Sequence, residues 1–125
     1  MRDQYHDFLP EYSIYPASLG AGAKTGDAYV DLQGFEGAMI VCGSGILTVD
    51  MTFQLMESDD HITFTAVADA DLVGEEPTLL EATDNEIAHF AYVGACRYLR
   101  VDTTVGTGIG FAAIIKGHPR HAPAV

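Results

Sequence analysis

The sequence predicts an all-β protein, either an antiparallel β-sandwich or a jelly-roll-like barrel, with extended N- and C-terminal arms. Apolar and polar residues alternate strictly from Leu47 to Leu55, which is typical of a strand with one buried and one solvated face. Several other short apolar runs are separated by turn-forming residues, and no long stretch has the 3.6-residue period of a helix. A chain of 125 residues, 48% of them hydrophobic, is long enough to fold as one domain.

The alternating run is the first half of a predicted β-hairpin. Turn-forming residues follow it from Glu57 to His61, and Ile62, Phe64 and Ala66 then resume the alternation. Two alternating runs joined by a short polar turn are typical of a hairpin. We therefore expect the apolar residues of both runs to face the core.

Further strands are expected on both sides of this hairpin. The run from Ala38 to Cys42 is apolar at every position, and such a strand is typically central and covered on both faces. A run from Ile109 to Lys116 closes the domain and places Ile109, Phe111, Ala113 and Ile115 on one face. Glycine-rich turns are expected at residues 43–45 and 103–108, and the remaining strand candidates are residues 29–32, 78–80, 87–93 and 96–102.

The two ends of the chain differ from its middle. Residues 1–26 mix aromatic residues with prolines and closely spaced glycines, and residues 118–125 contain two prolines. Both are predicted to be arms flanking a β-sandwich domain of residues 27–117.

We predict that the arms make most of the contacts with a partner protein, because aromatic side chains are frequent interface anchors and the tail adds a basic spot. The alternative is that both ends fold back on their own domain. The predicted partner-binding residues are Tyr5, Phe8, Tyr12, Tyr15, His118, Arg120 and His121.

The chain is strongly acidic, with 18 acidic and six basic residues and a formal net charge of −12. Such a surface repels phosphate backbones and anionic lipids, so neither nucleic acid nor a membrane is expected as a partner. The charge is compatible with simple solubility or with a basic partner surface. The first residues also lack the continuous apolar stretch of a signal peptide.

The two cysteines and two arginines inside strand-like runs have structural interpretations. Cys42 and Cys96 are expected to be buried thiols in a reducing cytosol, with a disulfide as the alternative. Arg97 and Arg100 are three positions apart and point to opposite faces of their strand. We expect at least one of them to form a salt bridge within the fold or at an interface.

No residue pattern predicts catalysis, a metal ion or a cofactor. His118 and His121 lack the further ligands that a zinc site needs. Asp59 and Asp60 lack the ligand spacing of a calcium loop and are explained by a turn. The Gly-x-Gly-x-Gly stretch at residues 106–110 lies between two strand patterns and not at a helix start, so a dinucleotide site is not expected.

Four segments resemble small virion proteins of tailed bacteriophages that are encoded among the head genes: YVDLQGFEGAMIVCGSG, FQLMESDDHITFTAVADADLVG, YVGACRYLRVDTTVGTG and GHPRHAPAV. Together they span residues 29–125, and the most specific parts are ESDD followed by FTAVADADL, preceded by Met56 in place of the usual Gln, and the terminal GHPRHAP.

This resemblance implies a structural protein of the virus particle that is not an enzyme. The first choice is a capsid decoration (cement) protein that forms a homo-oligomer, binds the major capsid protein, and lies on the virion surface after assembly in the host cytoplasm. A head–tail joining or tail structural protein is the alternative. The segments ESDDHITFTAV and RYLRV are also similar to discoidin-type carbohydrate-binding sandwiches, although the chain contains no Trp to stack on a sugar.

Overall fold

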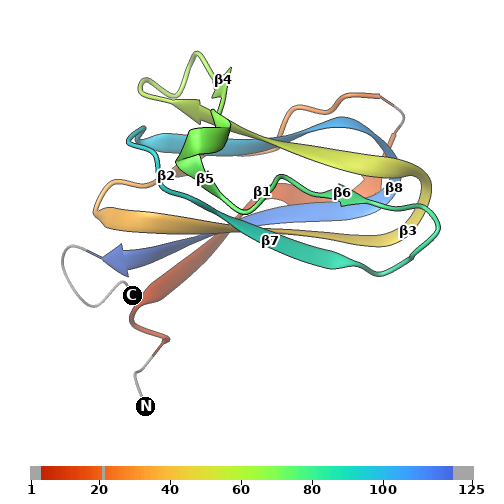
Figure 1. The fold of residues 1–125 in the computed structure, drawn as a ribbon, viewed down its shortest axis with the longest axis horizontal. Helices are drawn as coiled ribbons and strands as arrows, with labels where there is room; N and C mark the ends of the chain where they lie inside the picture. Colours follow the sequence, from red (N-terminus) through yellow and green to blue (C-terminus); the bar gives the residue numbers. More distant parts are fainter. Residues whose placement is uncertain (1–3, 21, 120–125) are drawn as a thin grey trace.

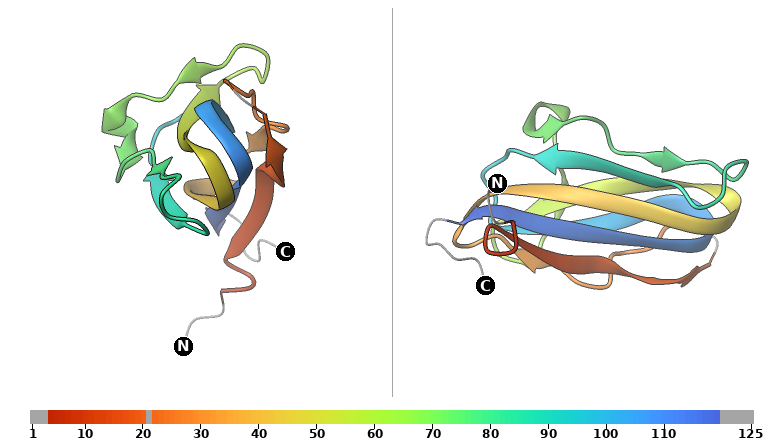
Figure 2. Two further views of the ribbon diagram at one scale, coloured as in Figure 1. Left: turned by 90° about the vertical axis from the view of Figure 1, so that its right-hand side faces the viewer. Right: turned by 90° about the horizontal axis from the view of Figure 1, so that it is seen from below.

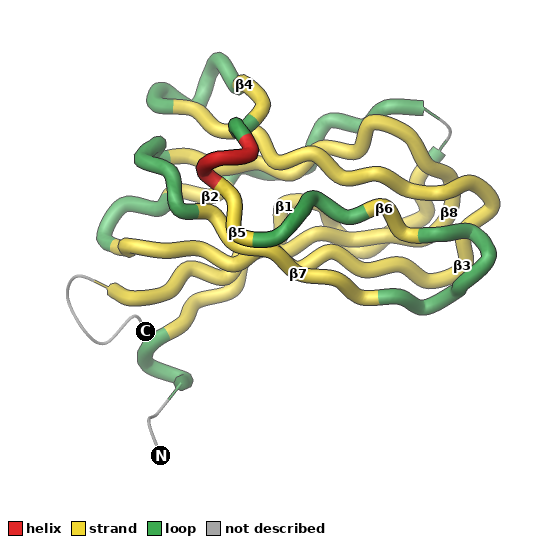
Figure 3. Tube along the Cα trace, in the orientation of Figure 1, coloured by secondary structure: helices red, strands yellow, loops and turns green. Residues whose placement is uncertain are grey.

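The computed structural model describes residues 4–20 and 22–119 and consists of antiparallel β-strands. The only helical element in these residues is the 3-10 turn η1 (Asp69–Asp71), shown in Figure 3. The predicted all-β class is therefore confirmed. The strands are β1 (Phe8–Leu19), β2 (Val30–Asp31), β3 (Phe35–Ser58), β4 (Thr65–Ala66), β5 (Leu72–Val73), β6 (Thr78–Leu79), β7 (Ile87–Tyr92) and β8 (Tyr98–Pro119).

Two long strands organise the fold. β3 has 24 residues and β8 has 22, and they pair with each other over most of their lengths. Register shifts interrupt this pairing between Ser44 and Phe53 of β3. Bulges of this kind bend paired strands, and here the two strands turn back together, so that one sheet folds into two layers (Figure 1).

The first layer contains the first half of β3 and the second half of β8, flanked by β1 and β7, with β5 beyond β7. The second layer contains the other halves of β3 and β8 together with β2, β4 and β6. β1 and β5 end the strand order without pairing to each other, so the sheet is open and is not a closed barrel (Figure 2).

The core lies between the two layers and forms one cluster of buried apolar side chains. Ile40 and Ile114 reach it from the first layer, and Phe53, Leu55 and Val101 reach it from the second. The alternation predicted for residues 47–55 is confirmed at Phe53 and Leu55, whose side chains are almost completely buried, but it is wrong at Val49, which is 44% exposed where the register shifts.

The predicted turns at residues 43–45 and 103–108 are wrong, because β3 and β8 continue through them. Gly108 shows the physical reason. Its φ is +136°, and a Cβ at this position would lie 2.5 Å from the carbonyl oxygen of Ile46. The glycine therefore allows a tight bend between two strands that stay paired, and it does not reverse the chain.

The second half of the predicted hairpin is also wrong in extent. β4 has two residues and pairs with β3 only at Met56 and Glu57. The carboxylate of Asp60 accepts hydrogen bonds from the backbone N–H groups of Ile62 and Thr63, each at 2.9 Å. These bonds stabilise a turn in place of a strand, and they leave Ile62 exposed.

Most of the predicted N-terminal arm belongs to the sheet. Residues 8–19 form β1, which pairs with β8 from Phe8 opposite Gly117 to Leu19 opposite Gly108. Ile14 is fully buried in the core. The expected boundary between residues 26 and 27 therefore does not coincide with the edge of the sheet, and β8 continues into the predicted tail as far as Pro119.

Candidate functional site

The outer face of the first layer is apolar across four neighbouring strands. Alternate residues of β1, β8, β3 and β7 face the core, and the residues between them point outward. The register aligns the outward residues in three rows: Pro10, Ile115, Met39 and Ala91; Tyr12, Ala113, Val41 and His89; and Phe111, Gly43 and Ile87. We call these residues the outer apolar face.

No residue of the outer apolar face is Asp, Glu, Lys or Arg, although the chain has a net charge of −12. Several of its side chains are well exposed: Met39 by 39%, Tyr12 by 49% and Ile87 by 72%. Single exposed apolar residues are common on protein surfaces, but a contiguous uncharged patch across four strands is typical of an interaction surface.

Glycines flatten this face. A Cβ at Gly43 would lie 2.2 Å from Cε1 of Phe111, so the Phe111 ring lies across the glycine of the neighbouring strand. The ring of Phe8 lies in the same way against Gly117, where a Cβ would be 2.9 Å from it. Aromatic rings that cover glycines on an adjacent strand stay close to the sheet. The face is therefore low in relief.

The sequence predicts the strand that carries this surface, but the predicted burial of both faces of that strand is wrong. The strand from Ala38 to Cys42 is central as predicted, between β7 and β8, but only one of its faces is covered. Ile40 and Cys42 are fully buried, whereas Met39 points outward and is exposed. Phe111 and Ile115 share a face as predicted, and that face is the outer one.

The predicted partner-binding residues are brought partly together. Tyr5, Tyr12 and Tyr15 are exposed, and the rings of Tyr12 and Tyr15 pack edge to face with centroids 6.2 Å apart. Phe8 lies opposite Gly117, so the start of β1 is beside the end of β8, where His118 is located. Arg120 and His121 lie outside the described residues. Sequence reasoning missed Met39, Val41, Ile87, Phe111 and Ile115 as surface residues.

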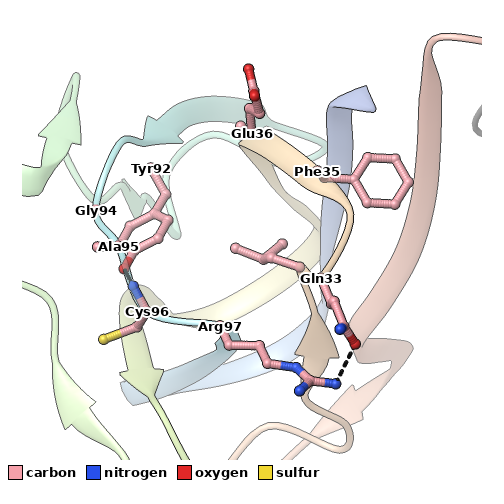
Figure 4. Close-up of a pocket in the computed structure, with 10 residues that line it drawn as sticks. Gln33, Phe35, Glu36, Tyr92, Gly94, Ala95, Cys96 and Arg97 are labelled. Carbon is pink, nitrogen blue, oxygen red and sulfur yellow. Dashed lines mark hydrogen bonds between the residues drawn. The ribbon is translucent and has the colours of Figure 1, made fainter. Parts of the chain in front are cut away.

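A cavity of about 440 Å³ opens where β2, the start of β3 and the end of β7 meet. Arg97 and Gln33 line it, and Nη2 of Arg97 donates a hydrogen bond to Oε1 of Gln33 at 2.7 Å (Figure 4). The same guanidinium makes two hydrogen bonds to the carboxylate of Asp31, at 2.8 and 2.9 Å. The charge of Arg97 is therefore matched within the protein.

Cys96 lines this cavity and is of a residue type that can act as a nucleophile, but its environment keeps the thiol protonated. Burial and then the negative charge of Glu57 raise the pKa of the Cys96 thiol to about 11. Sγ of Cys96 lies 3.5 Å from Oε1 of Glu57 and donates to it. A thiol with a raised pKa is a poor nucleophile near neutral pH. Cys42 is also a free thiol, and burial in the core raises its pKa further.

The expected arginine salt bridges are confirmed for both residues. Arg97 pairs with Asp31, and Nε of Arg100 lies 2.8 Å from Oδ1 of Asp102. The guanidinium of Arg100 also lies over the ring of Phe64, 4.3 Å from its centroid.

An aromatic cluster lies on the second layer. Tyr29 stacks on His61 with centroids 5.2 Å apart, and Tyr98 packs edge to face against both rings, at 5.4 Å from Tyr29 and 5.1 Å from His61. These three rings therefore pack against one another through their faces and edges. A sugar would need a free ring face to stack on.

Within residues 4–20 and 22–119, no three His, Cys, Asp or Glu side chains are grouped so that they could hold a metal ion. The same residues contain no helix that is long and apolar enough to cross a membrane.

No known protein family matches the chain, and no curated protein matches it in sequence. Among solved structures, it is similar to the SPBc2 prophage-derived protein YomS, with a TM-score of 0.58 and 12% identity over 90% of this chain and 94% of YomS. PirA is a more distant structure, with a TM-score of 0.42 and 10% identity over 89% of this chain and 93% of PirA.

The similarity to YomS indicates the fold of this chain. The chain is a β-rich protein whose fold is shared with a prophage-derived protein, YomS. At 12% identity the likeness concerns the fold alone. The TM-score of 0.42 for PirA is too low to support an argument.

Proposed function

We propose that this chain is a structural component of a bacteriophage particle, and that it is a capsid decoration protein. It would bind the outside of the major capsid protein lattice and stabilise the head, on virions assembled in the host cytoplasm. The proposal assigns no catalytic step to the chain. The sequence segments similar to phage virion proteins support it, as does the fold shared with a prophage-derived protein.

The proposed mode of attachment rests on one structural observation. The pairing of Phe8 with Gly117 brings the start of the predicted N-terminal arm and His118, the first residue of the predicted C-terminal tail, to the same end of the molecule. Tyr5 is 72% exposed there, and His118 follows Gly117 directly. We call Tyr5, Phe8 and His118 the attachment end. Exposed aromatic side chains such as Tyr5 are enriched in interface hot spots.

Truncations that test this attachment must leave β1 and β8 intact. Deleting residues 1–20 would remove β1, including the buried Ser13 and Ile14, and would confuse binding with folding. The suitable truncations are residues 1–6 and residues 120–125, because both leave the strands intact. A side-chain variant, Tyr5→Ala, is compared with Ile62→Ala, since Ile62 is 77% exposed in the loop between β3 and β4.

Each protein is mixed with empty capsid shells and sedimented. We expect the full chain and Ile62→Ala to co-sediment, and the truncations and Tyr5→Ala to bind about tenfold more weakly, as is common for an interface anchor. Full binding by both truncations would contradict attachment through the ends, and absence of binding by the full chain would contradict the decoration role.

The same preparation separates the other candidates. Co-sedimentation with purified tails and not with heads would favour a head–tail joining or tail structural protein. Specific binding on a glycan array that depends on Tyr29 would favour a carbohydrate-binding module. The packing of Tyr29, His61 and Tyr98 against one another argues against that second outcome.

A further inference from the structure

We propose that the outer apolar face is the contact surface between two copies of this chain, which pair face to face about a two-fold axis. The proposal is independent of the decoration role, because it concerns the first layer of the sheet and a contact that needs no capsid. It assigns a particular surface to the homo-oligomer that the sequence resemblance implies.

The strand pattern indicates that this face is covered in the working protein. From Ala38 to Cys42 every residue is apolar, a composition typical of strands covered on both faces. The core covers one face, since Ile40 and Cys42 are fully buried. Met39 and Val41 lie on the other face, where Met39 is exposed and Val41 is partly exposed. A second molecule is the simplest cover.

Charge favours a copy of the same chain over a basic partner. No Asp or Glu is among the residues of the outer apolar face. A basic partner would be selected by carboxylates, and this face offers none. Two copies that each carry −12 would repel one another through most surfaces, whereas this face lets them meet without opposing carboxylates. The net charge therefore opposes self-association elsewhere but leaves this contact open.

The size and shape of the face suit a weak, reversible dimer. The three rows span about five residues of each of four strands, and at about 4.8 Å between strands and about 3.4 Å per residue they cover roughly 330 Å² per copy. Two copies would bury roughly 650 Å² through these rows, which is the size of a weak, transient contact. Phe111 lies flat across Gly43, and low relief is what face-to-face sheet packing requires. A two-fold contact uses the same patch on both copies, and it is the commonest symmetry of homo-oligomers.

The test uses a matched pair of substitutions on the full chain. Ile87 lies on the outer apolar face and is 72% exposed, and Ile62 lies off it and is 77% exposed. Ile87→Lys and Ile62→Lys introduce the same charge at similar exposure and reduce the net negative charge equally. Met39→Lys places the charge nearer the middle of the face. Circular dichroism and melting temperature verify that all three variants fold.

Sedimentation velocity gives the mass of each protein across micromolar concentrations. We expect the full chain and Ile62→Lys to form dimers of the 13.4 kDa chain. Ile87→Lys and Met39→Lys should raise the dimer Kd by roughly 100-fold, because a lysine buried without a partner in an apolar contact is costly. A monomeric full chain, or equal dimerisation of all the variants, would overturn the proposal.

Salt provides a second readout. Raising the ionic strength screens the repulsion between two acidic copies and leaves apolar contact intact. The dimer Kd should therefore fall as salt rises, whereas binding to a basic partner would weaken. Dissociation of the dimer at high salt would contradict the proposal. Capsid binding that is lost in Ile87→Lys while the full chain remains monomeric would assign the face to the capsid protein and would also overturn it.

Discussion

The hydroxyl oxygen of Ser13 in β1 accepts a hydrogen bond from the backbone N–H of Val101 in β8, at 2.8 Å and across 88 positions of sequence. The same hydroxyl donates to the carbonyl oxygen of Ala28 at 2.8 Å, and the Ser13 side chain is completely buried. β1 belongs to the first layer, and Val101 lies in the second-layer half of β8. One hydroxyl therefore connects the N-terminal strand to the opposite layer.

Replacing this hydroxyl should weaken the fold. Ser13→Ala leaves the buried N–H of Val101 without this acceptor, which typically costs about 1–3 kcal/mol of the free energy of unfolding. The control is Ser18→Ala, because Ser18 is exposed on the same strand and such changes usually stay within about 0.5 kcal/mol. Urea denaturation measures both. Equal midpoints for the two variants would show that the Ser13 bond contributes nothing.

The bend in the long strands should depend on Gly108. Gly108→Ala forces a φ of +136° on an alanine and places its Cβ 2.5 Å from a backbone oxygen, so we expect a loss of roughly 1–3 kcal/mol or more. Gly20→Ala is the matched control, because a Cβ at Gly20 meets nothing within 4 Å. Thermal melting compares them, and a Gly108→Ala protein as stable as Gly20→Ala would contradict the role assigned to this bend.

The Cys96 thiol should react slowly with iodoacetamide near neutral pH, because burial and Glu57 raise its pKa to about 11. Glu57→Gln removes the negative charge and should lower the pKa, so alkylation should become faster at a given pH. Mass spectrometry follows labelling over a pH series. Glu81→Gln removes an exposed carboxylate elsewhere and should leave the rate unchanged; if it accelerates labelling as much as Glu57→Gln, the effect is not local.

The Asp60 turn should make stability depend on pH at the acidic end. Hydrogen bonds from the N–H groups of Thr63 and Ile62 and from the Ser58 hydroxyl lower the pKa of Asp60 to about 2. A carboxylate with a depressed folded pKa stabilises the fold above its unfolded pKa of about 3.9, and this contribution is lost as pH falls toward 2. NMR titration should give a midpoint of about 2 for Asp60. Asp60→Asn should reduce the loss of stability between about pH 4 and pH 2, and an unchanged loss would argue against this turn.

The outer apolar face shows which features of a surface a local sequence pattern can predict. The apolar run from Ala38 to Cys42 correctly predicted a central strand, and the alternation through Phe111 and Ile115 correctly predicted a shared face. The pattern could not tell which face the core covers. The partners of these residues lie far away in the sequence, as Val41 and Ala113 show by pairing across the sheet.

The sequence by itself determined the all-β class, the buried alternation of Phe53 and Leu55, and the acidic surface, because side-chain period and composition are local properties. Only the tertiary structure decided that β1 joins the sheet, that Gly108 marks a bend within a paired strand, and that the face carrying Met39 is exposed on the single chain. A glycine in a turn and a glycine in a bulge have the same sequence signature, and they differ only in whether a partner strand continues to pair beside them.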